Sequence, residues 1–319
     1  AGAAAAGLPL HGYLARLAGR GAAAGGCALP VPAFGVLGGR RRAGGLACRE
    51  LLVLPTAAGS FGEAMAIGVE VYHALRGVIG RRYGQDACNV GDEGGFAPGV
   101  RDTGEALDVL MQAVGQAGHA GRVGIGVDVA ASELYDAGSG LYDLDLGGLG
   151  GSGGTKVTAE QLMSVYRGWF EKYPIVAMGD PFDREDWAAY SRFASEFGVE
   201  RQIVGGDLLA ADTGRMQKAL EVGACNALLL RLDQAGTVTG AVEASSLAQR
   251  AGWGVVVSHL SAETEDAFIA DLAVGLRCGQ IRAGAPCRSE RLAKYNELLR
   301  IEEELGPAAV FASGAFRSP

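Results

Sequence analysis

The sequence predicts an α/β protein built as a closed eight-stranded barrel. Short apolar runs rich in Val, Ile and Leu recur along the 319 residues and alternate with longer helical patterns. Runs this apolar are typical of strands buried on both faces, as in parallel sheets. Eight such strands suit a closed barrel ringed by helices. A doubly wound open sheet is the alternative that the pattern leaves open.

The strands and helices follow one another in a regular order. Two strands, at residues 29–37 and 51–55, come first, and two helical patterns near 60–82 and 102–118 follow them. Six strand–helix pairs complete the chain, with strands expected near 123–129, 174–178, 202–205, 226–230, 253–258 and 279–282, and helices near 158–172, 185–197, 213–222, 237–251, 264–277 and 288–305. The glycine-rich stretch 147–154 lacks the ending of a phosphate-binding loop and is predicted to be a flexible surface loop.

Composition and charge narrow the class of protein. The chain has 28 Lys and Arg residues against 36 Asp and Glu, a net charge of −8, which argues against a general nucleic-acid binder. Its six cysteines form no C-x-x-C pair and are expected to be reduced thiols of a cytoplasmic protein. No apolar run approaches the roughly 18–20 residues that cross a bilayer, and the first residues lack the basic start of a secretory signal. Because the chain begins at Ala1 rather than Met, we expect it to be a fragment.

Charged and polar residues stand where the predicted strands end. They are Glu50 just before the second strand, Glu93 in the loop after the first long helix, and Asp128, Asp180, Asp207, Arg231, His259 and Arg282 at the later strand ends. The carboxyl ends of barrel strands carry the functional residues of such folds. A charge at such a position needs a partner, so the pattern predicts either a functional site or mutual pairing of carboxylates and arginines.

Three stretches of sequence carry a resemblance to a known family. They are residues 89–98 (NVGDEGGFAP), 258–271 (SHLSAETEDAFIAD) and 284–291 (GAPCRSER). With further stretches in the same order along the whole chain, they make it similar to the enolases, and to animal enolases in particular. The resemblance implies an enolase-type TIM-like (β/α)8 barrel, in the order ββαα(βα)6, at residues 27–319. Residues 1–26 would be a helical remnant of the amino-terminal α+β domain, most of which is absent.

The resemblance also implies an activity. Enolases, or phosphopyruvate hydratases, are lyases of glycolysis that convert 2-phosphoglycerate to phosphoenolpyruvate and water. A lysine base and Mg²⁺ serve this chemistry, since the proton next to a carboxylate is very weakly acidic and negative charge develops when it leaves. The resemblance further implies a cytoplasmic location, a small anionic metabolite as partner, and a homodimer formed through the amino-terminal domain. Because most of that domain is absent, we expect a monomer or a weak association.

Some positions match the site residues of the family. Glu93 resembles the general acid, and Glu50 resembles its glutamate partner. Asp128 resembles the first metal ligand, and His259 and Ser261 match positions on the substrate side. The resemblance therefore implies an acid, one metal ligand and part of a substrate pocket.

Other positions depart from the family, namely two metal ligands, two lysines and two substrate contacts. Gly179 and Gly206 stand at two metal-ligand positions, Arg231 and Arg282 at two lysine positions, and Arg42 and Leu260 at two positions that contact substrate. Arg231 stands at the position of the lysine base, Arg282 at the second lysine, and Arg42 at a histidine. Mg²⁺ takes about six oxygen ligands, and an arginine keeps its proton at neutral pH. We therefore expect weak or absent Mg²⁺ binding and impaired or absent turnover.

Three interpretations remain open. The chain is a catalytically inactive member of the family, a pseudoenzyme with a binding or structural role, or it is a functional hydratase. The third interpretation is a metal-independent binder of anionic metabolites, in which Arg231 and Arg282 replace the cation. The same two arginines, facing Glu50, Glu93 and Asp128, would alternatively form a metal-free network of ion pairs.

Overall fold

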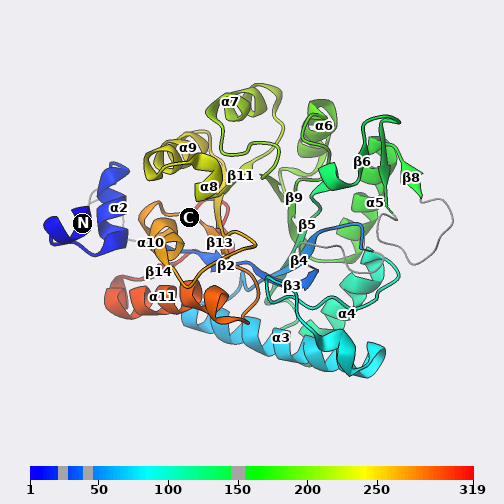
Figure 1. Cartoon of the computed structure of the whole chain (residues 1–319), viewed down its shortest axis with the longest axis horizontal. Coiled ribbons are helices and arrows are strands. Elements are labelled where there is room, and N and C mark those ends of the chain that lie inside the picture. The colour runs from blue at the N-terminus through cyan, green and yellow to red at the C-terminus, as the bar shows by residue number, and fades with distance from the viewer. Residues whose placement is uncertain (21–27, 39–45, 145–154) are drawn as a thin grey trace.

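A computed structural model describes residues 1–20, 28–38, 46–144 and 155–319. Its main sheet has nine strands in the order β2-β13-β12-β11-β10-β9-β5-β4-β3. Only Ala33 separates β2 (Val31–Pro32) from β3 (Phe34–Gly38), so the two edges of the sheet are one stretch of chain. The sheet therefore closes into the predicted barrel of eight strands (Figure 1). The other seven are β4 (Glu50–Leu54), β5 (Gly124–Asp128), β9 (Ile175–Gly179), β10 (Gln202–Gly205), β11 (Ala227–Leu230), β12 (Gly254–Ser258) and β13 (Gln280–Arg282).

One strand of the barrel runs against the others. β4 pairs antiparallel with both β3 and β5, whereas the remaining neighbours are parallel. Its first residue, Glu50, lies opposite Asp128, the last residue of β5. The expectation that Glu50 precedes the second strand is thus corrected, because Glu50 begins β4. It reaches the functional rim because β4 is reversed.

Helices surround the barrel, and most begin at a side-chain cap. Ser60, Asp102, Thr158, Asp186, Asp212 and Thr237 each accept a hydrogen bond from a backbone N–H in the first turn of the helix that follows. The helices after the first two strands are α3 (Phe61–Tyr83), α4 (Thr103–Gln116), α5 (Ala159–Lys172), α6 (Trp187–Phe197), α7 (Thr213–Val222), α8 (Leu232–Ala235), α9 (Val238–Arg250), α10 (Phe268–Gly275) and α11 (Ser289–Leu305). No helix in the described part of the chain is both long and apolar enough to cross a membrane.

Three local features differ from the predicted pattern. The helix expected near 264–277 is shorter, because α10 begins only at Phe268. A three-stranded antiparallel sheet of β6 (Tyr135–Asp136), β7 (Leu141–Asp143) and β8 (Lys156–Val157) follows β5. β1 (Ala28–Leu29) pairs with β14 (Val310–Phe311) outside the barrel. Strands of two or three residues carry too little periodicity to be recognised in a sequence, and the glycine-rich stretch 147–154 lies outside the described residues.

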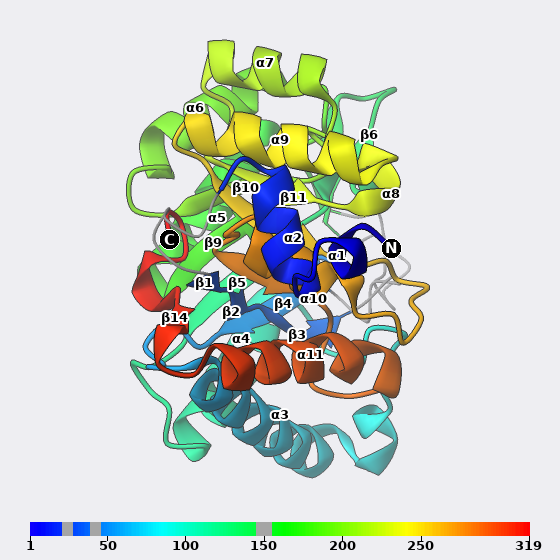
Figure 2. The same cartoon turned by 90° about the vertical axis from the view of Figure 1, so that its left-hand side faces the viewer.

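The amino-terminal segment lies against the barrel helices. It holds α1 (Gly2–Ala5) and α2 (Leu10–Leu17), and Figure 2 shows α2 in front of α10. The His11 backbone N–H donates to Asp271 Oδ1 at 3.0 Å, and Leu14 is buried in the main core. The segment is helical and docked on α10. That residues 1–26 are the remnant of a separate domain stays a prediction.

Candidate functional site

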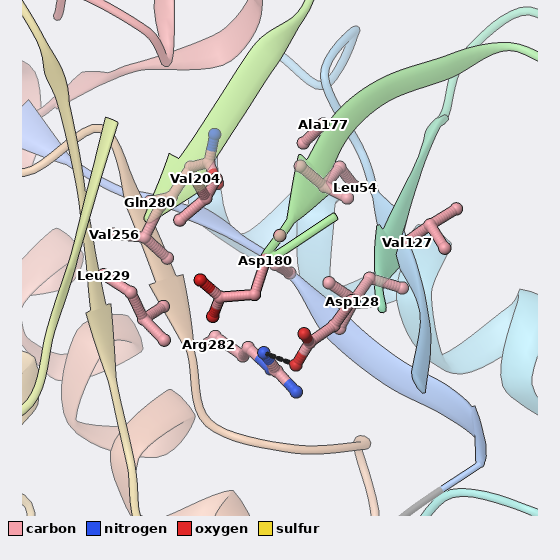
Figure 3. Close-up of a pocket in the computed structure, with 13 residues that line it drawn as sticks. Leu54, Val127, Asp128, Ala177, Asp180, Val204, Leu229, Val256, Gln280 and Arg282 are labelled. Carbon is pink, nitrogen blue, oxygen red and sulfur yellow. Dashed lines mark hydrogen bonds and ion pairs between the residues drawn. The ribbon is translucent and has the colours of Figure 1, made fainter. Parts of the chain in front are cut away.

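Three residues from three strands meet at the rim where the barrel strands end. The guanidinium of Arg282, on β13, donates to Glu50 Oε2 through Nη2 at 2.5 Å and through Nε at 3.1 Å. Its Nη1 donates to Asp128 Oδ2 at 2.5 Å, and Figure 3 shows the two side chains facing each other. All three side chains are buried. One arginine therefore bridges two buried carboxylates across the barrel.

A second arginine binds the same oxygen of Asp128. Arg49 donates to Asp128 Oδ2 from Nη2 at 2.5 Å and from Nε at 3.0 Å, and its backbone N–H donates to the Asp128 carbonyl at 2.8 Å. Arg49 is not among the residues predicted from the sequence. The signal that could have indicated it is its position directly before Glu50, because the reversal of β4 brings both residues to the rim. Two guanidinium groups thus surround one carboxylate.

This network shifts the protonation of its carboxylates in opposite directions. Although burial opposes ionisation, Arg282 and Arg49 hold the pKa of Asp128 below its usual range. Burial raises the pKa of Glu50 to about 7, against the charge of Arg282 and with the help of nearby Glu93 and Asp128. Glu50 Oε1 has no hydrogen-bond partner among the described residues. The pKa of Arg282 is itself raised, since its carboxylate partners outweigh the effect of burial.

Two glycines leave the neighbouring strand ends without side chains. A Cβ at Gly179 would lie 3.4 Å from Asp128 Oδ1, an ordinary contact, so the missing side chain belongs beside Asp128. A Cβ at Gly206 would lie 2.5 Å from Asp180 Oδ2 and 3.0 Å from Leu229 Cδ2, which is too close. A side chain at Gly206 would therefore require Asp180 or Leu229 to move, whereas a Cβ at Gly179 has room.

Asp180 is no substitute ligand. Its carboxylate accepts the backbone N–H groups of Gly206 at 3.0 Å, Asp207 at 2.8 Å and Leu208 at 3.2 Å, and also the Tyr190 hydroxyl at 3.2 Å. Burial and the charge of Asp207 raise the pKa of Asp180 to about 6. Its oxygens are occupied by these donors.

The residues at the rim do not fit Mg²⁺ in this arrangement. Mg²⁺ needs several oxygen ligands with free lone pairs, but Arg49 and Arg282 occupy Asp128 Oδ2 and the two glycines offer none. Among the described residues, no group of three or more His, Cys, Asp or Glu side chains is arranged to hold a metal ion. The positive charge at this rim is supplied by guanidinium groups.

Glu93 is held by a separate set of contacts. The loop that carries it is fixed to β3, because the Phe96 N–H donates to the Val36 carbonyl at 2.9 Å. Glu93 Oε1 accepts the Ser261 hydroxyl at 3.0 Å, and Oε2 lies 3.1 Å from His259 Nε2. The structure thus brings Glu93, His259 and Ser261 together, as the resemblance implies.

Arg291 determines which proton His259 carries. Its Nη1 lies 2.6 Å from His259 Nδ1 and also donates to the Leu260 carbonyl at 2.7 Å. Since a guanidinium only donates, Nδ1 accepts and the neutral ring holds its proton on Nε2, facing Glu93. Burial lowers the pKa of His259, and the nearby charge of Arg291 acts in the same direction. Arg291 lies in residues 284–291, one of the stretches that resemble the family, and no role was predicted for it.

Glu93 is ionised in this setting. Burial opposes its charge, but the His259 hydrogen bond, the charge of Arg282 and the Ser261 hydroxyl together hold the pKa of Glu93 well below its usual range. A general acid must hold a proton near neutral pH. These contacts therefore favour the ionised form of Glu93.

Arg231 does not join the network, which corrects the expectation for it. Its guanidinium forms a fork with Asp233, with Nη2 at 2.7 Å from Oδ2 and Nε at 3.2 Å from Oδ1. Its side chain is 25% exposed, against 7% for Arg282. Of the two predicted arginines, only Arg282 faces the buried carboxylates, and Arg49 is the second member of the network. Arg42 lies outside the described residues.

The space between the buried charges is small, whereas a cavity of about 230 Å³ is lined by Ser261, Arg291 and the neighbouring loops. A cavity of about 30 Å³ is lined by Arg49, Glu93, Leu229, Arg231, Ser258, His259, Ser261 and Arg282. A second cavity of about 30 Å³ follows the barrel axis beneath it, beside Gly179 and Asp180 (Figure 3). Each has room for one or two water molecules. The side chains at the rim largely fill the space between them.

Comparison with known proteins identifies relatives along the whole chain. Residues 26–319 match the family model described as "Enolase, C-terminal TIM barrel domain". The chain is 52% identical over 320 residues to Enolase 2 of Hevea brasiliensis and to an enolase of Solanum lycopersicum, with all of the chain and 71% of each relative covered. An enolase of Eimeria tenella is 52% identical, with 72% of it covered. The likeness is therefore not confined to animal enolases.

Proposed function

This chain is a member of the enolase family, and from that premise we propose that its barrel is a catalytically impaired form that holds buried arginines where the family reaction requires Mg²⁺. The observation that carries the proposal is the pair of guanidinium groups on Asp128 Oδ2, both at 2.5 Å. Two guanidinium groups offset the charge of this carboxylate, which disfavours binding of a further cation. The family reaction, 2-phosphoglycerate to phosphoenolpyruvate and water, is then reduced or absent.

The proton transfers of the reaction also lack suitable groups. Arg231, at the position of the lysine base, keeps its proton at neutral pH and is paired with Asp233. Glu93, at the position of the acid, has a lowered pKa and is ionised. Loss of a base, an acid and a metal removes many kcal/mol of transition-state stabilisation, and each 1.4 kcal/mol corresponds to about tenfold in rate.

The rim favours a closed network over a site for a metabolite. The cavity between Glu93 and Arg282 is about 30 Å³ and the cavity beside Ser261 and Arg291 is about 230 Å³, both below the roughly 300–1,000 Å³ of typical ligand sites. We therefore favour a pseudoenzyme with a structural or binding role in the cytoplasm over a metal-independent metabolite binder. A working hydratase is the alternative that the experiment must exclude.

A Mg²⁺ titration tests the proposal. Thermal unfolding of the unmodified chain should show no saturable stabilisation by millimolar MgCl₂ beyond that of a salt control at equal ionic strength. Formation of phosphoenolpyruvate from 2-phosphoglycerate should remain at background. Magnesium-dependent turnover by the unmodified chain would overturn the proposal.

A restored variant supplies the positive control. Gly179→Glu, Gly206→Asp and Arg282→Lys together return two carboxylates and remove one guanidinium from Asp128. This variant should gain Mg²⁺-dependent stabilisation, yet turnover should stay at background because Arg231 remains protonated. If the variant binds no Mg²⁺ although it folds, the substitutions do not account for the loss of the metal.

A further inference from the structure

The loop that carries Ser261 is held from one side by the first turns of α11. Arg291 and Lys294 are three residues apart on this helix, so their side chains leave the same face. Arg291 donates to the carbonyl of Leu260 at 2.7 Å from Nη1 and to the carbonyl of Ser261 at 2.5 Å from Nη2. Lys294 donates to the carbonyl of Thr264 at 2.5 Å. Two cations of one helix thus bind three carbonyl groups of the loop.

All three N–H groups of the Lys294 ammonium have acceptors. Nζ lies 2.5 Å from Glu263 Oε2, and it donates to the carbonyls of Thr264 and Glu290 at 2.5 and 2.8 Å. The Lys294 side chain is 1% exposed, against 15% for Glu263. A buried charge is costly unless it is paired and hydrogen-bonded. The position of Lys294 therefore depends on these three contacts.

Glu263 connects Lys294 to the turn that contains Ser261. Its Oε1 accepts the backbone N–H of Leu260 at 3.2 Å, while its Oε2 pairs with Lys294. The carboxylate therefore closes a short turn, and Ser261 lies inside that turn. From this position the Ser261 hydroxyl donates to Glu93 Oε1 at 3.0 Å. A chain of contacts thus runs from the buried ammonium, through one carboxylate and one turn, to Glu93.

Arg291 and Lys294 differ in what else they hold. Arg291 Nη2 also donates to the carbonyl of Asp92 at 3.0 Å, directly before Glu93, so this guanidinium fixes both sides of the contact between Ser261 and Glu93. The described contacts of Lys294 are with the loop of Ser261 and with its own helix. Replacement of Lys294 therefore changes one side of that contact alone.

We propose that Lys294, acting through Glu263, is a positioning residue for the hydrogen bond between Ser261 and Glu93. The ammonium fixes the Glu263 carboxylate, the carboxylate fixes the turn, and the turn directs the hydroxyl at Glu93. The part of the site that matches the family is then held in place by contacts within the protein. The inference goes beyond the proposed function, since it applies whether or not the chain converts 2-phosphoglycerate.

A double-mutant cycle at Ser261 and Glu93 tests the proposal. Ser261→Ala, Glu93→Gln, the double variant and the unmodified chain are unfolded with urea near neutral pH, and the coupling is calculated from the four unfolding equilibrium constants. A hydrogen bond to a charged group should give a coupling of at least about tenfold. The same cycle with Lys294→Met throughout should give less than about threefold, because the hydroxyl is no longer held against Glu93.

Two further variants separate positioning from a general loss of stability. Lys172→Met removes an exposed lysine that pairs with Asp108, and the coupling should keep its original value. Glu263→Ala removes the link between Lys294 and the turn and should reduce the coupling as Lys294→Met does. Because Glu263 is less deeply buried, this variant also serves if Lys294→Met fails to fold.

Three outcomes would overturn the proposal. The first is a coupling near one in the unmodified chain, which would mean that the hydrogen bond contributes nothing. The second is an undiminished coupling in Lys294→Met or in Glu263→Ala. The third is an equal loss of coupling in Lys172→Met. None of these measurements uses Mg²⁺ or 2-phosphoglycerate, so their result is independent of the test of the proposed function.

Discussion

The two halves of the candidate site differ in how they satisfy buried charge. On one side, Glu93 is held by a histidine and a hydroxyl that match the family. On the other side, Asp128 and Glu50 share the guanidinium of Arg282 next to two glycines. In the first half, both carboxylate oxygens of Glu93 have hydrogen-bond partners within the protein. In the second half, glycines stand where the resemblance implies ligands, and arginines neutralise the carboxylates, as buried carboxylates require.

The largest effect on stability is expected from replacing Arg282, the arginine shared by Glu50 and Asp128. Arg282→Met leaves Glu50 and Asp128 buried beside fewer positive charges and should lower the free energy of unfolding by about 3–5 kcal/mol. Urea denaturation measures this loss. Arg231→Met is the matched control, because its ion pair with Asp233 is partly exposed and should contribute at most about 1 kcal/mol. Equal losses in the two variants would contradict the network.

Glu50 and Glu93, one from each half, should also respond oppositely to pH. The pKa of Glu50 is raised from 4.5 to about 7, so the folded chain holds a proton that the unfolded chain has lost. Stability from this group therefore falls as pH rises from about 4.5 to 7, by up to about 3 kcal/mol. Glu93 has a lowered pKa, so its contribution is present above about pH 4.5 and is lost as pH falls.

Chemical denaturation between about pH 5 and 7 measures the difference. Glu50→Gln should flatten the decline in stability across this range, because glutamine cannot titrate. Glu93→Gln should leave the decline in place and remove part of the loss below about pH 4.5. A decline that is unchanged in Glu50→Gln would show that the raised pKa belongs to another group, and Asp180 is the next candidate.

The smallest effect on stability is expected from substitutions at Gly179 and Gly206. Gly206→Ala should lower the free energy of unfolding by about 1–3 kcal/mol, since its Cβ would press on Asp180 and Leu229. Gly179→Ala should be neutral or stabilise by about 0.4–1 kcal/mol, because the Cβ has room and the unfolded chain loses freedom. Thermal denaturation of the pair measures the contrast. A cost at Gly179 equal to that at Gly206 would mean that the space beside Asp128 is filled.

Much of the fold was predictable because its elements are long and periodic. The family resemblance and the eight apolar strands predicted the closed barrel, and α7 begins and ends at the expected residues. The reversed direction of β4 was not predicted, since an apolar run of five residues carries no sign of its direction.

The sequence indicated several of the residues that meet at this rim, but it did not indicate how they pair. Glu93, His259 and Ser261 meet as the resemblance implies. Arg49 was missed and Arg231 misplaced, because each pairing depends on side-chain direction. Arg231 has an aspartate two residues away and turns to that local partner, whereas Arg282 has buried carboxylates across the barrel. Sequence position alone does not distinguish these outcomes.

The bridge from Arg282 also constrains the order in which the chain folds. Arg282 is 232 residues from Glu50 and 154 residues from Asp128 along the sequence. During synthesis, β4 and β5 emerge long before β13, so Glu50 and Asp128 remain hydrated until the last barrel strand is made. Closing so long a loop is slow, and larger proteins commonly pass through partly assembled states. The final strand, β13, therefore brings the guanidinium of Arg282, which pairs with Glu50 on β4. A nascent barrel that lacks β13 should stay open.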